Sequence, residues 1–203
     1  MDILPNFIVF EGGDGAGTST QLNLLREKME GRGRRFFPTF EPTNGPLGRV
    51  LRSALEGELT LKGETLAFLF AADRNEHLYG PGGVRERCRE GAIVVSDRYV
   101  PSSLVYQGID CGDELPQRLN EGFPAPQILF YFELDPLCAL ERIQGRGKQD
   151  LFEYREFQEK VCRRYQDILP RYRDAGVEVI TINAAQPIET VAEAIWKVIA
   201  ALL

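Results

Sequence analysis

The sequence predicts an α/β fold, a doubly wound parallel sheet of five strands flanked by helices, within one domain over residues 1–203. Two observations lead to this prediction. Five short apolar runs alternate with segments of helical periodicity, which is typical of parallel strands covered on both faces. A glycine-rich turn also joins the first apolar run to the first helical segment. No internal repeat, low-complexity tract or linker interrupts the alternation.

The elements are expected in this order along the chain. Residues 6–11 form a first strand, and Leu22, Leu25 and Met29 recur at helical spacing in a helix that ends at Gly31. The Pro/Gly/Asn cluster at 41–46 is a loop by composition. The other expected elements are strands at 34–40, 92–96, 127–134 and 177–182, and helices at 47–55, 62–89 (interrupted at 80–83) and 188–202.

The glycine-rich turn predicts a phosphate-binding loop. It reads Gly12-Gly13-Asp14-Gly15-Ala16-Gly17-Thr18-Ser19-Thr20. Its glycines let backbone N–H groups converge on an anion, and the following helix N-terminus adds favourable potential. The turn matches the pattern G-x-x-x-x-G-K-[ST], except that Thr18 replaces the lysine that reaches the β- and γ-phosphates. An ordinary tight turn from strand to helix is the alternative interpretation.

Polar residues also follow the next two strands, at the sheet edge where ligands bind in such folds. Glu41-Pro42 comes after the second strand, and Asp97-Arg98-Tyr99 comes after the third. Arg98 is a candidate to hold a phosphate, and Asp97 to contact a metal, a water molecule or the glycine-rich loop. A salt bridge at the end of the strand is the alternative.

Further residues are candidates for nucleotide binding. Phe70 and Arg74 share a helix face, where a ring could stack on a base beside a guanidinium; a core ring next to a solvated arginine is the alternative. Gln107 could hydrogen-bond a base edge, or it is a solvated residue before a turn. Arg52 could point into the same crevice, or it lies on the surface.

A basic loop follows the fourth strand. It contains Arg142, Arg146 and Lys148 together with two glycines. A mobile arginine can stabilise the charge that spreads over a transferring phosphoryl group. A solvated surface loop is the alternative interpretation.

Composition limits the classes of partner and compartment. Thirty acidic residues against 24 basic ones give a net charge of −6, which disfavours a nucleic-acid polymer as partner. No apolar run approaches the ~20 residues that span a bilayer, and no signal pattern is present, so a cytoplasmic protein without membrane contact is expected. Reduced thiols are expected rather than disulfides or a zinc site for the scattered cysteines, Cys88, Cys111, Cys138 and Cys162.

In this order and spacing, the motifs resemble those of the thymidylate kinases, a family of P-loop nucleoside monophosphate kinases. The matching residues are Phe10 to Gly17, Ser19-Thr20-Gln21, Glu41-Pro42, Phe70 with Arg74, Asp97-Arg98-Tyr99 with Ser102, Tyr106-Gln107-Gly108 and the arginine loop at 142–146. The resemblance spans nearly the whole chain. It implies a fold of the P-loop NTPase type, a homodimer, Mg²⁺ as cofactor, and transfer of the γ-phosphoryl group of ATP to dTMP.

The resemblance also implies roles for individual residues. Catalysis would involve Asp14, Arg98, Arg142 and Arg146, the last two in a lid loop at about 142–152. Residues 12–20 would bind the ATP phosphates, with Ser19 on Mg²⁺ and Asp97 supporting the metal through water. The acceptor nucleotide would contact Glu41, Pro42, Arg52, Phe70, Arg74, Arg98, Tyr99, Ser103 and Gln107. Of these, Phe70 would stack on thymine, and Arg98 and Arg52 would hold the dTMP phosphate.

Two positions depart from the family pattern. Thr18 removes a positive charge from beside the transferring phosphoryl group, which could cost several orders of magnitude in rate. Phe40 stands where many bacterial members have an arginine before Glu-Pro. We expect an active dTMP kinase in which the lid arginines compensate for Thr18. The alternatives are a nucleotide-binding pseudokinase without turnover and a kinase of another pyrimidine monophosphate.

Overall fold

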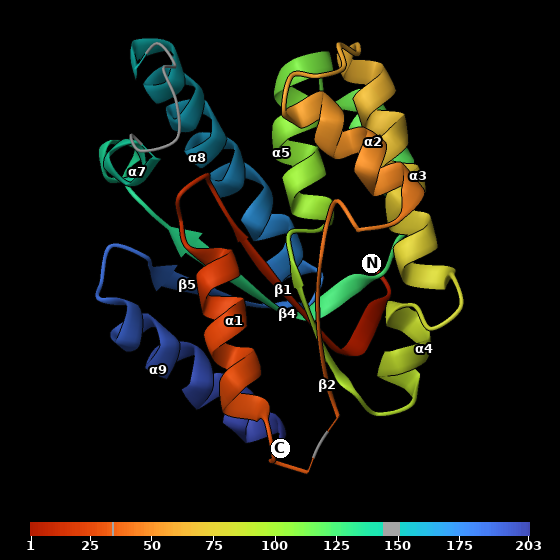
Figure 1. Ribbon diagram of the computed structural model, residues 1–203, viewed down its shortest axis with the longest axis vertical. Helices are drawn as coiled ribbons and strands as arrows, with labels where there is room; N and C mark the ends of the chain where they lie inside the picture. The colour runs from red at the N-terminus through yellow and green to blue at the C-terminus, as the bar shows by residue number, and fades with distance from the viewer. Residues whose placement is uncertain (34, 144–150) are drawn as a thin grey trace.

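The computed structural model of the chain describes residues 1–33, 35–143 and 151–203. These residues form a five-stranded sheet with helices on both faces (Figure 1). All strand pairs are parallel, and the strand order is β2-β3-β1-β4-β5. The predicted fold class, a doubly wound parallel α/β sheet, is confirmed.

The five predicted strands are all present, with bounds that differ by three residues or fewer. They are β1 (Ile3–Gly12), β2 (Phe36–Phe40), β3 (Ile93–Asp97), β4 (Ala125–Glu133) and β5 (Glu178–Asn183). The helices are α1 (Thr18–Met29), α2 (Pro46–Leu55), α3 (Gly63–Tyr79), α4 (Val84–Arg89), α5 (Val100–Cys111), α6 (Glu114–Asn120), α7 (Pro136–Ile143), α8 (Leu151–Asp174) and α9 (Ile188–Ile199), followed by a 3₁₀ turn at Ala200–Leu202.

One helix boundary differs from the prediction in a way that matters. Helix α1 begins at Thr18, four residues before Leu22, the first apolar residue of the predicted helical spacing, because Gly17 takes a left-handed conformation that ends the glycine-rich turn. The end of the predicted phosphate loop is therefore already helical. The predicted interruption at 80–83 is confirmed, since it separates α3 from α4.

Strand β1 lies in the centre of the sheet and contributes side chains to a hydrophobic core on each of its two faces. Side chains alternate along a strand, so Ile8 and Phe10 face the core formed with α1 and α9, whereas Phe7 and Val9 face the core formed with α4. All four are fully buried. This packing fixes the end of β1, from which the glycine-rich turn emerges.

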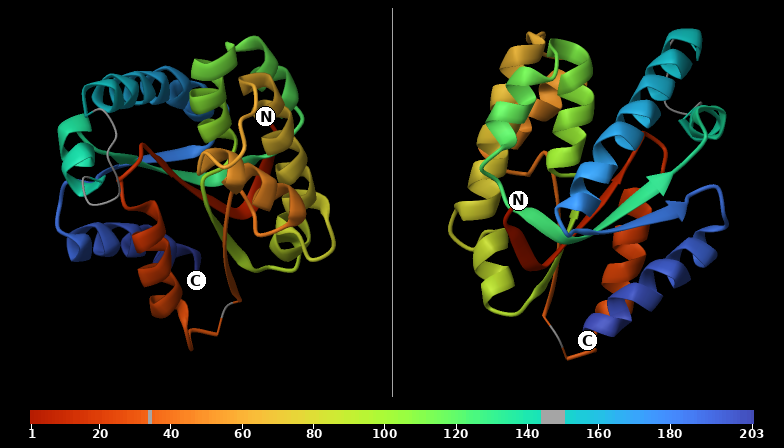
Figure 2. Two further views of the ribbon diagram at one scale, coloured as in Figure 1. Left: turned by 45° about the horizontal axis from the view of Figure 1, so that its top comes forward. Right: turned by 180° about the vertical axis from the view of Figure 1, so that it is seen from behind.

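The helices divide between the two faces of the sheet. Helices α1 and α9 cover one face, and α3, α4, α5 and α8 lie on the other (Figures 1 and 2). Tyr131 of β4 packs on Tyr165 of α8, with ring centroids 5.0 Å apart. This contact belongs to a third core, formed by β4, α5 and α8.

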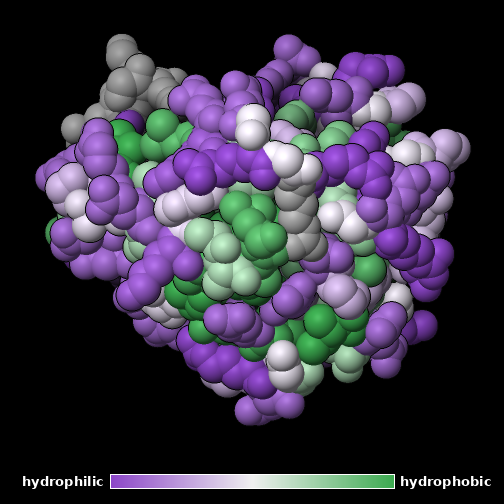
Figure 3. Space-filling model, turned by 90° about the horizontal axis from the view of Figure 1, so that it is seen from below, coloured by the Kyte–Doolittle hydropathy of each residue, from purple (hydrophilic) through white to green (hydrophobic). Residues whose placement is uncertain are grey.

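The C-terminus lies at the end of the molecule opposite α2 and α5 (Figure 1). Viewed from below, this end shows hydrophobic side chains gathered within a surround of hydrophilic ones (Figure 3). Leu203, the last residue, is partly exposed. Within the described part of the chain, no helix is both long enough and apolar enough to cross a bilayer.

Candidate active site

The glycine-rich segment forms a turn between β1 and α1. Gly15 and Gly17 have φ angles of 78° and 88°, which other residues rarely adopt. Gly12 lies close to β4, since a Cβ there would be 2.9 Å from the carbonyl oxygen of Phe132. The turn therefore depends on its glycines, and it presents the N-terminus of α1 to a cavity.

This cavity, the glycine-loop cavity, has a volume of about 740 Å³. Every predicted loop residue from Gly13 to Thr20 lines it, while Gly12 is the last residue of β1. Its other lining residues are Gln21, Arg98, Arg142, Tyr154, Ala184, Gln186, Ile188 and Val191. Converging backbone N–H groups at a helix N-terminus suit a phosphate group.

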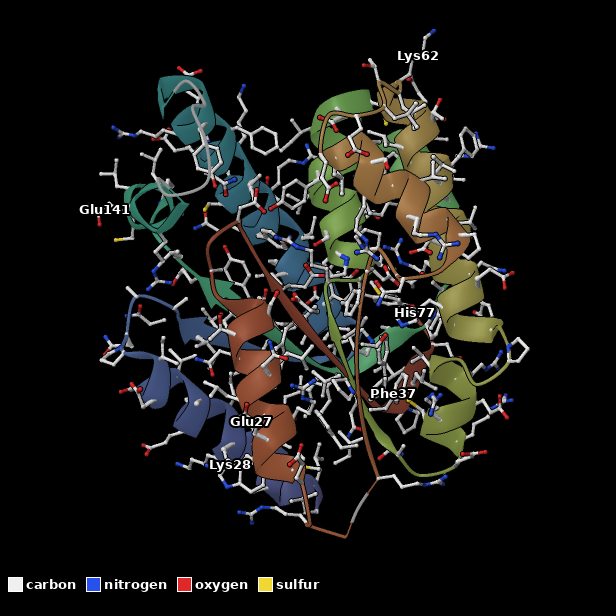
Figure 4. All side chains as sticks on the ribbon, in the orientation of Figure 1. Glu27, Lys28, Phe37, Lys62, His77 and Glu141 are labelled. Atoms are coloured by element: carbon white, nitrogen blue, oxygen red, sulfur yellow. The ribbon has the colours of Figure 1, made fainter. Side chains whose placement is uncertain are left out.

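Thr18 is buried at the first position of α1. Among the described residues that line the glycine-loop cavity, none is a lysine. Lys28 of the same helix projects at the opposite end (Figure 4), where its Nζ lies 4.8 Å from the centroid of the Trp196 ring. The cationic side chains that line the described part of the cavity are those of Arg98 and Arg142.

Arg98 follows β3 and has a left-handed φ of 70°. Its Nη1 donates to the carbonyl oxygen of Gly12 at 3.0 Å, and its Nη2 donates to Oδ1 of Asp14 at 2.9 Å. Burial would lower the pKa of Arg98, but the neighbouring Tyr106, Tyr165 and two carboxylates raise it well above its ordinary value. Arg98 thus stays a cation, and its ion pair reaches across to the glycine-rich turn.

Asp14 is held by three side chains. Its Oδ1 accepts from Arg98 and from the hydroxyl of Tyr106, the latter at 3.2 Å. Its Oδ2 accepts from Nε2 of Gln158 on α8 at 3.2 Å, and its backbone N–H donates to Oε1 of Gln158 at 3.3 Å. These contacts tie the glycine-rich turn to α5 and α8 and fix the carboxylate in one place.

Ser19 and Asp97 provide oxygen atoms that would suit Mg²⁺. The hydroxyl of Ser19 donates to Oδ2 of Asp97. Asp97 is buried, and its Oδ1 has no hydrogen-bond partner among the described residues. The described residues contain no group of three or more acidic, histidine or cysteine ligands. The pair of one hydroxyl and one carboxylate fits Mg²⁺, which commonly takes one or two protein ligands and completes its shell with phosphates and water.

A second cavity of about 360 Å³, the Phe70 cavity, lies beside the first. Its lining residues are Asp14, Glu41, Pro42, Leu55, Leu66, Phe70, Arg74, Arg98, Tyr99, Ser102, Ser103, Tyr106, Gln107, Asp110 and Phe157. All predicted acceptor-side residues except Arg52 are among them. Asp14 and Arg98 line both cavities.

Arg74 is fully buried at the wall of the Phe70 cavity, so the solvated alternative is wrong. Its Nε and Nη2 donate to Oε2 of Glu41 at 2.9 and 2.7 Å, its Nη2 also donates to Ser103 at 3.0 Å, and its Nη1 donates to Asn120. His77, at the end of α3 (Figure 4), meets Oε1 of Glu41 at 3.0 Å. Burial raises the pKa of Glu41, but Arg74 and His77 outweigh it and lower the pKa overall.

Gln107 is also buried rather than solvated. It lines the Phe70 cavity, and its Oε1 has no hydrogen-bond partner among the described residues. An unpaired buried amide oxygen is costly, and a ligand N–H would satisfy it. Phe70 lines the same cavity, and its stacking on a base stays a prediction.

Tyr99 belongs both to a hydrophobic core and to the wall of the Phe70 cavity. Its ring is fully buried against Phe7, with centroids 5.0 Å apart, and its hydroxyl donates to the carbonyl oxygen of Pro124 at 3.0 Å. It lines the Phe70 cavity, yet its polar atom is already paired. The contact that Tyr99 offers to a ligand in this cavity is therefore an apolar one.

Arg52 does not line the Phe70 cavity. Its guanidinium donates to the carbonyl oxygen of Pro42 at 2.9 Å and to Thr43 and Asn44 in the same loop. It also lies over the ring of Phe40, 5.6 Å from the centroid. Its predicted contact with a phosphate stays a prediction.

Of the two predicted lid arginines, Arg142 is among the residues that the structure describes. The guanidinium of Arg142 donates to the carbonyl oxygen of Gly15 at 3.2 Å and to that of Ala184 at 2.9 Å. It therefore bridges the glycine-rich turn and the loop after β5. Arg146 and most of the predicted lid loop lie outside the described residues.

The prediction assigned no role to Glu11, which is fully buried. Its carboxylate accepts from the hydroxyls of Ser102 at 2.7 Å and Tyr165 at 2.8 Å, and from the backbone N–H of Tyr99 at 2.8 Å. Burial raises its pKa to about 7. Glu11 thus anchors the start of α5 beside Arg98. The sequence signal for Glu11 was a carboxylate at the end of an apolar strand. Gln158 and Tyr165 lie in a charged helix, and no sequence pattern indicated a role for them.

Comparisons with known proteins identify the family of the chain. The thymidylate kinase family model matches residues 10–195. A Treponema pallidum protein to which the name thymidylate kinase is assigned is 45% identical over 198 residues, which covers 96% of this chain and 95% of that protein. A protein of Aeropyrum pernix assigned the same name is 38% identical over 181 residues, covering 88% and 86%. The chain therefore belongs to the thymidylate kinase family of nucleoside monophosphate kinases.

Proposed function

We propose that this enzyme transfers the γ-phosphoryl group of ATP to dTMP, giving dTDP and ADP. The observation that carries the proposal is that the glycine-loop cavity and the Phe70 cavity share Asp14 and Arg98. A triphosphate in the first cavity and a monophosphate in the second would bring their phosphates together at these residues. Direct in-line transfer requires this juxtaposition.

On the donor side, residues 12–20 cradle the ATP phosphates through backbone N–H groups. Ser19 would hold Mg²⁺ directly, and Asp97 would do so through water, as the unpaired Oδ1 of Asp97 supports. When bound, the metal neutralises charge on the phosphates. The apolar residues Ile188 and Val191 line the same cavity, and we expect the nucleoside to contact them.

On the acceptor side, the Phe70 ring stacks on the base. Gln107 accepts a hydrogen bond from a base N–H through its unpaired Oε1, and Arg74 presents its guanidinium at the wall of the cavity. Glu41 and Ser103 hold Arg74 in place. Pro42 and Tyr99 offer apolar contacts to the acceptor. Arg52, whose guanidinium donates to the carbonyl oxygen of Pro42, would contact the acceptor phosphate.

In the transfer step, a phosphate oxygen of dTMP forms a bond to the γ-phosphorus of ATP. The bond from that phosphorus to the β–γ bridging oxygen breaks, and ADP leaves with the electron pair. The acceptor phosphate is already ionised, so Asp14 aligns the acceptor and is not needed as a strong base. Arg98 neutralises charge where the two substrates meet.

Thr18 leaves this step without the usual lysine. We infer that the lid arginines, Arg142 and Arg146, supply the missing positive charge. The position of Arg142 on the wall of the glycine-loop cavity supports this for one of the two. For Arg146 the expected outcome is that Arg146→Ala lowers kcat far more than it weakens ATP binding.

The function is tested by measuring ADP formation from ATP and Mg²⁺ with dTMP, dUMP, dCMP or dGMP as acceptor, and with no acceptor as the control. Turnover with dTMP in excess of the others supports the proposal. Binding of dTMP without turnover indicates a pseudokinase, in which Thr18→Lys should restore activity. Preference for dUMP or dCMP indicates a kinase of another pyrimidine monophosphate.

We also propose that the enzyme works as a cytoplasmic homodimer, as the family resemblance implies. Analytical ultracentrifugation of the purified protein tests the oligomeric state. A species of one chain at all concentrations would contradict the dimer.

A further inference from the structure

Tyr154 has a hydroxyl group that the fold does not satisfy. It lies in the first turns of α8, and its side chain is half-buried at the wall of the glycine-loop cavity. Its hydroxyl oxygen is nevertheless fully buried, and it has no hydrogen-bond partner among the described residues. Buried hydroxyl groups in native proteins are nearly always paired, so an unpaired one calls for an explanation.

Other unpaired groups occur at the same site. The described residues contain five side chains with a buried, unpaired nitrogen or oxygen atom. Three of these side chains line the two cavities, namely Gln21, Gln107 and Tyr154. A fourth, Asp97, accepts a hydrogen bond from Ser19 of the glycine-rich turn through its other oxygen. The clustering indicates that bound substrates complete these hydrogen bonds.

The position of Tyr154 on α8 places it over the glycine-rich turn. Residues four apart share a helix face, so Tyr154 lies one turn from Gln158 on the same face. Gln158 contacts both the carboxylate and the backbone N–H of Asp14. The face of α8 that holds the glycine-rich turn therefore continues to Tyr154.

Burial, together with the carboxylate of Asp14, keeps the Tyr154 hydroxyl protonated. Burial raises the pKa of Tyr154, and the carboxylate of Asp14 raises it further, while the nearby Arg98 lowers it in part. The net shift is upward, so the group is a neutral hydrogen-bond donor at physiological pH. Both Asp14 and Arg98 lie where the two cavities meet, and their charges act on this hydroxyl.

We propose that the hydroxyl of Tyr154 donates a hydrogen bond to the γ-phosphoryl group of the bound nucleotide. It would thereby supply one of the donor contacts that a lysine at position 18 would otherwise make. This inference rests on the proposed use of ATP as phosphoryl donor. It makes Tyr154 a catalytic residue, distinct from the lid arginines because it contributes a donor and no charge.

The test compares the binding of a non-hydrolysable ATP analogue with that of ADP, both with Mg²⁺, by isothermal titration calorimetry. Tyr154→Phe removes the hydroxyl and keeps the ring. It should weaken binding of the analogue by about tenfold or more, as expected for a lost hydrogen bond to a charged group. Binding of ADP should stay unchanged, because ADP has no γ-phosphoryl group.

Tyr172→Phe is the matched control. Tyr172 is another buried tyrosine of α8, outside the lining of both cavities. Loss of the Tyr172 hydroxyl should leave the ratio of the affinities for the ATP analogue and for ADP unchanged. A double variant adds a second test, since in the Thr18→Lys background the lysine should take over the contact and the effect of Tyr154→Phe should shrink.

Two results would overturn the inference. One is an unchanged ratio of analogue to ADP affinity in Tyr154→Phe. The other is equal weakening of both ligands, which would indicate a structural role. The binding measurements need no turnover, so they decide the role of Tyr154 even if the wild-type protein fails to phosphorylate dTMP. Thermal unfolding of each variant shows whether the fold is kept.

Discussion

Glu41 offers a test of how the acceptor side of the site is built. Its carboxylate has two basic side chains as partners, since Oε2 accepts two hydrogen bonds from Arg74 and Oε1 meets Nδ1 of His77 at 3.0 Å. The side chains of Glu41 and Arg74 are 3% and 1% exposed, so water cannot replace either partner. We predict the effect of Glu41→Gln, which keeps the shape of the side chain and removes its charge.

The expected loss is large because the guanidinium of Arg74 stays buried without its counter-charge. Removing one partner of a buried ion pair typically costs about 3–5 kcal/mol of folding free energy. The remaining partners of Arg74, Ser103 and Asn120, are neutral and cannot offset the charge. The guanidinium should also shift from its place on the cavity wall, so binding of dTMP should weaken at least tenfold.

The pH dependence gives a sign that can be checked. The pKa of Glu41 is lowered in the folded state, so its ionised form contributes stability above its ordinary pKa of 4.5. This contribution is lost as the pH falls through the folded-state pKa. The difference in stability between wild type and Glu41→Gln should therefore be largest near neutral pH and should shrink in acid.

Urea unfolding, followed by circular dichroism and by the fluorescence of the single tryptophan, measures the loss. The double variant Glu41→Gln with Arg74→Met should recover part of the stability, because it removes the unpaired charge. It should not recover dTMP binding, because the guanidinium is gone. A loss below about 1 kcal/mol in the single variant, or dTMP binding equal to wild type, would refute the argument.

Three further predictions follow from single residues. The pKa of Glu11 is raised to about 7, so the folded state binds its proton more tightly than the unfolded chain, and this makes the wild-type stability fall as the pH rises from 5 to 8. Glu11→Gln should reduce this fall, by at most about 3 kcal/mol, and parallel urea titrations at several pH values check this. Gly12→Ala should cost about 1–3 kcal/mol in urea unfolding and abolish ATP binding, since its Cβ would lie 2.9 Å from a β4 carbonyl oxygen. Arg142→Ala should raise the KM for ATP several-fold, because the guanidinium bridges Gly15 and Ala184, and should also lower kcat, because it supplies charge that Thr18 lacks; an unchanged kcat in steady-state kinetics would contradict the second role.

Local patterns in the sequence were sufficient to predict the sheet and the residues at its carboxyl edge. The strands are apolar and the turns rich in glycine, and parallel topology brings the ends of β1, β2 and β3 to one edge. Arg98 and Glu41 were found in this way, because each directly follows a strand. Such positions are fixed by the fold class alone.

Contacts between distant segments could not be predicted in the same way. Gln158 and Tyr154 lie about 140 residues from the glycine-rich turn, on a charged helix whose inner face no local pattern reveals. The orientation of Arg52 was also beyond the sequence, because it depends on carbonyl oxygens of the loop after β2. These residues are placed by the packing of α2 and α8, and that packing is a property of the whole fold.

The free energy of folding that the site costs bears on the choice between an active kinase and a pseudokinase. Burying the guanidinium of Arg74 and leaving Gln107 unpaired both lower the stability of the free protein. A protein that only needed to fold would be more stable with apolar residues at these positions. The cost is offset when a ligand completes the hydrogen bonds, and it falls on the acceptor side, away from Thr18. A scaffold that bound ATP alone would have no use for a second cavity joined to the first through Asp14 and Arg98, whereas phosphoryl transfer requires one. A pseudokinase that also bound dTMP would keep both cavities, so the turnover assay separates it from the kinase.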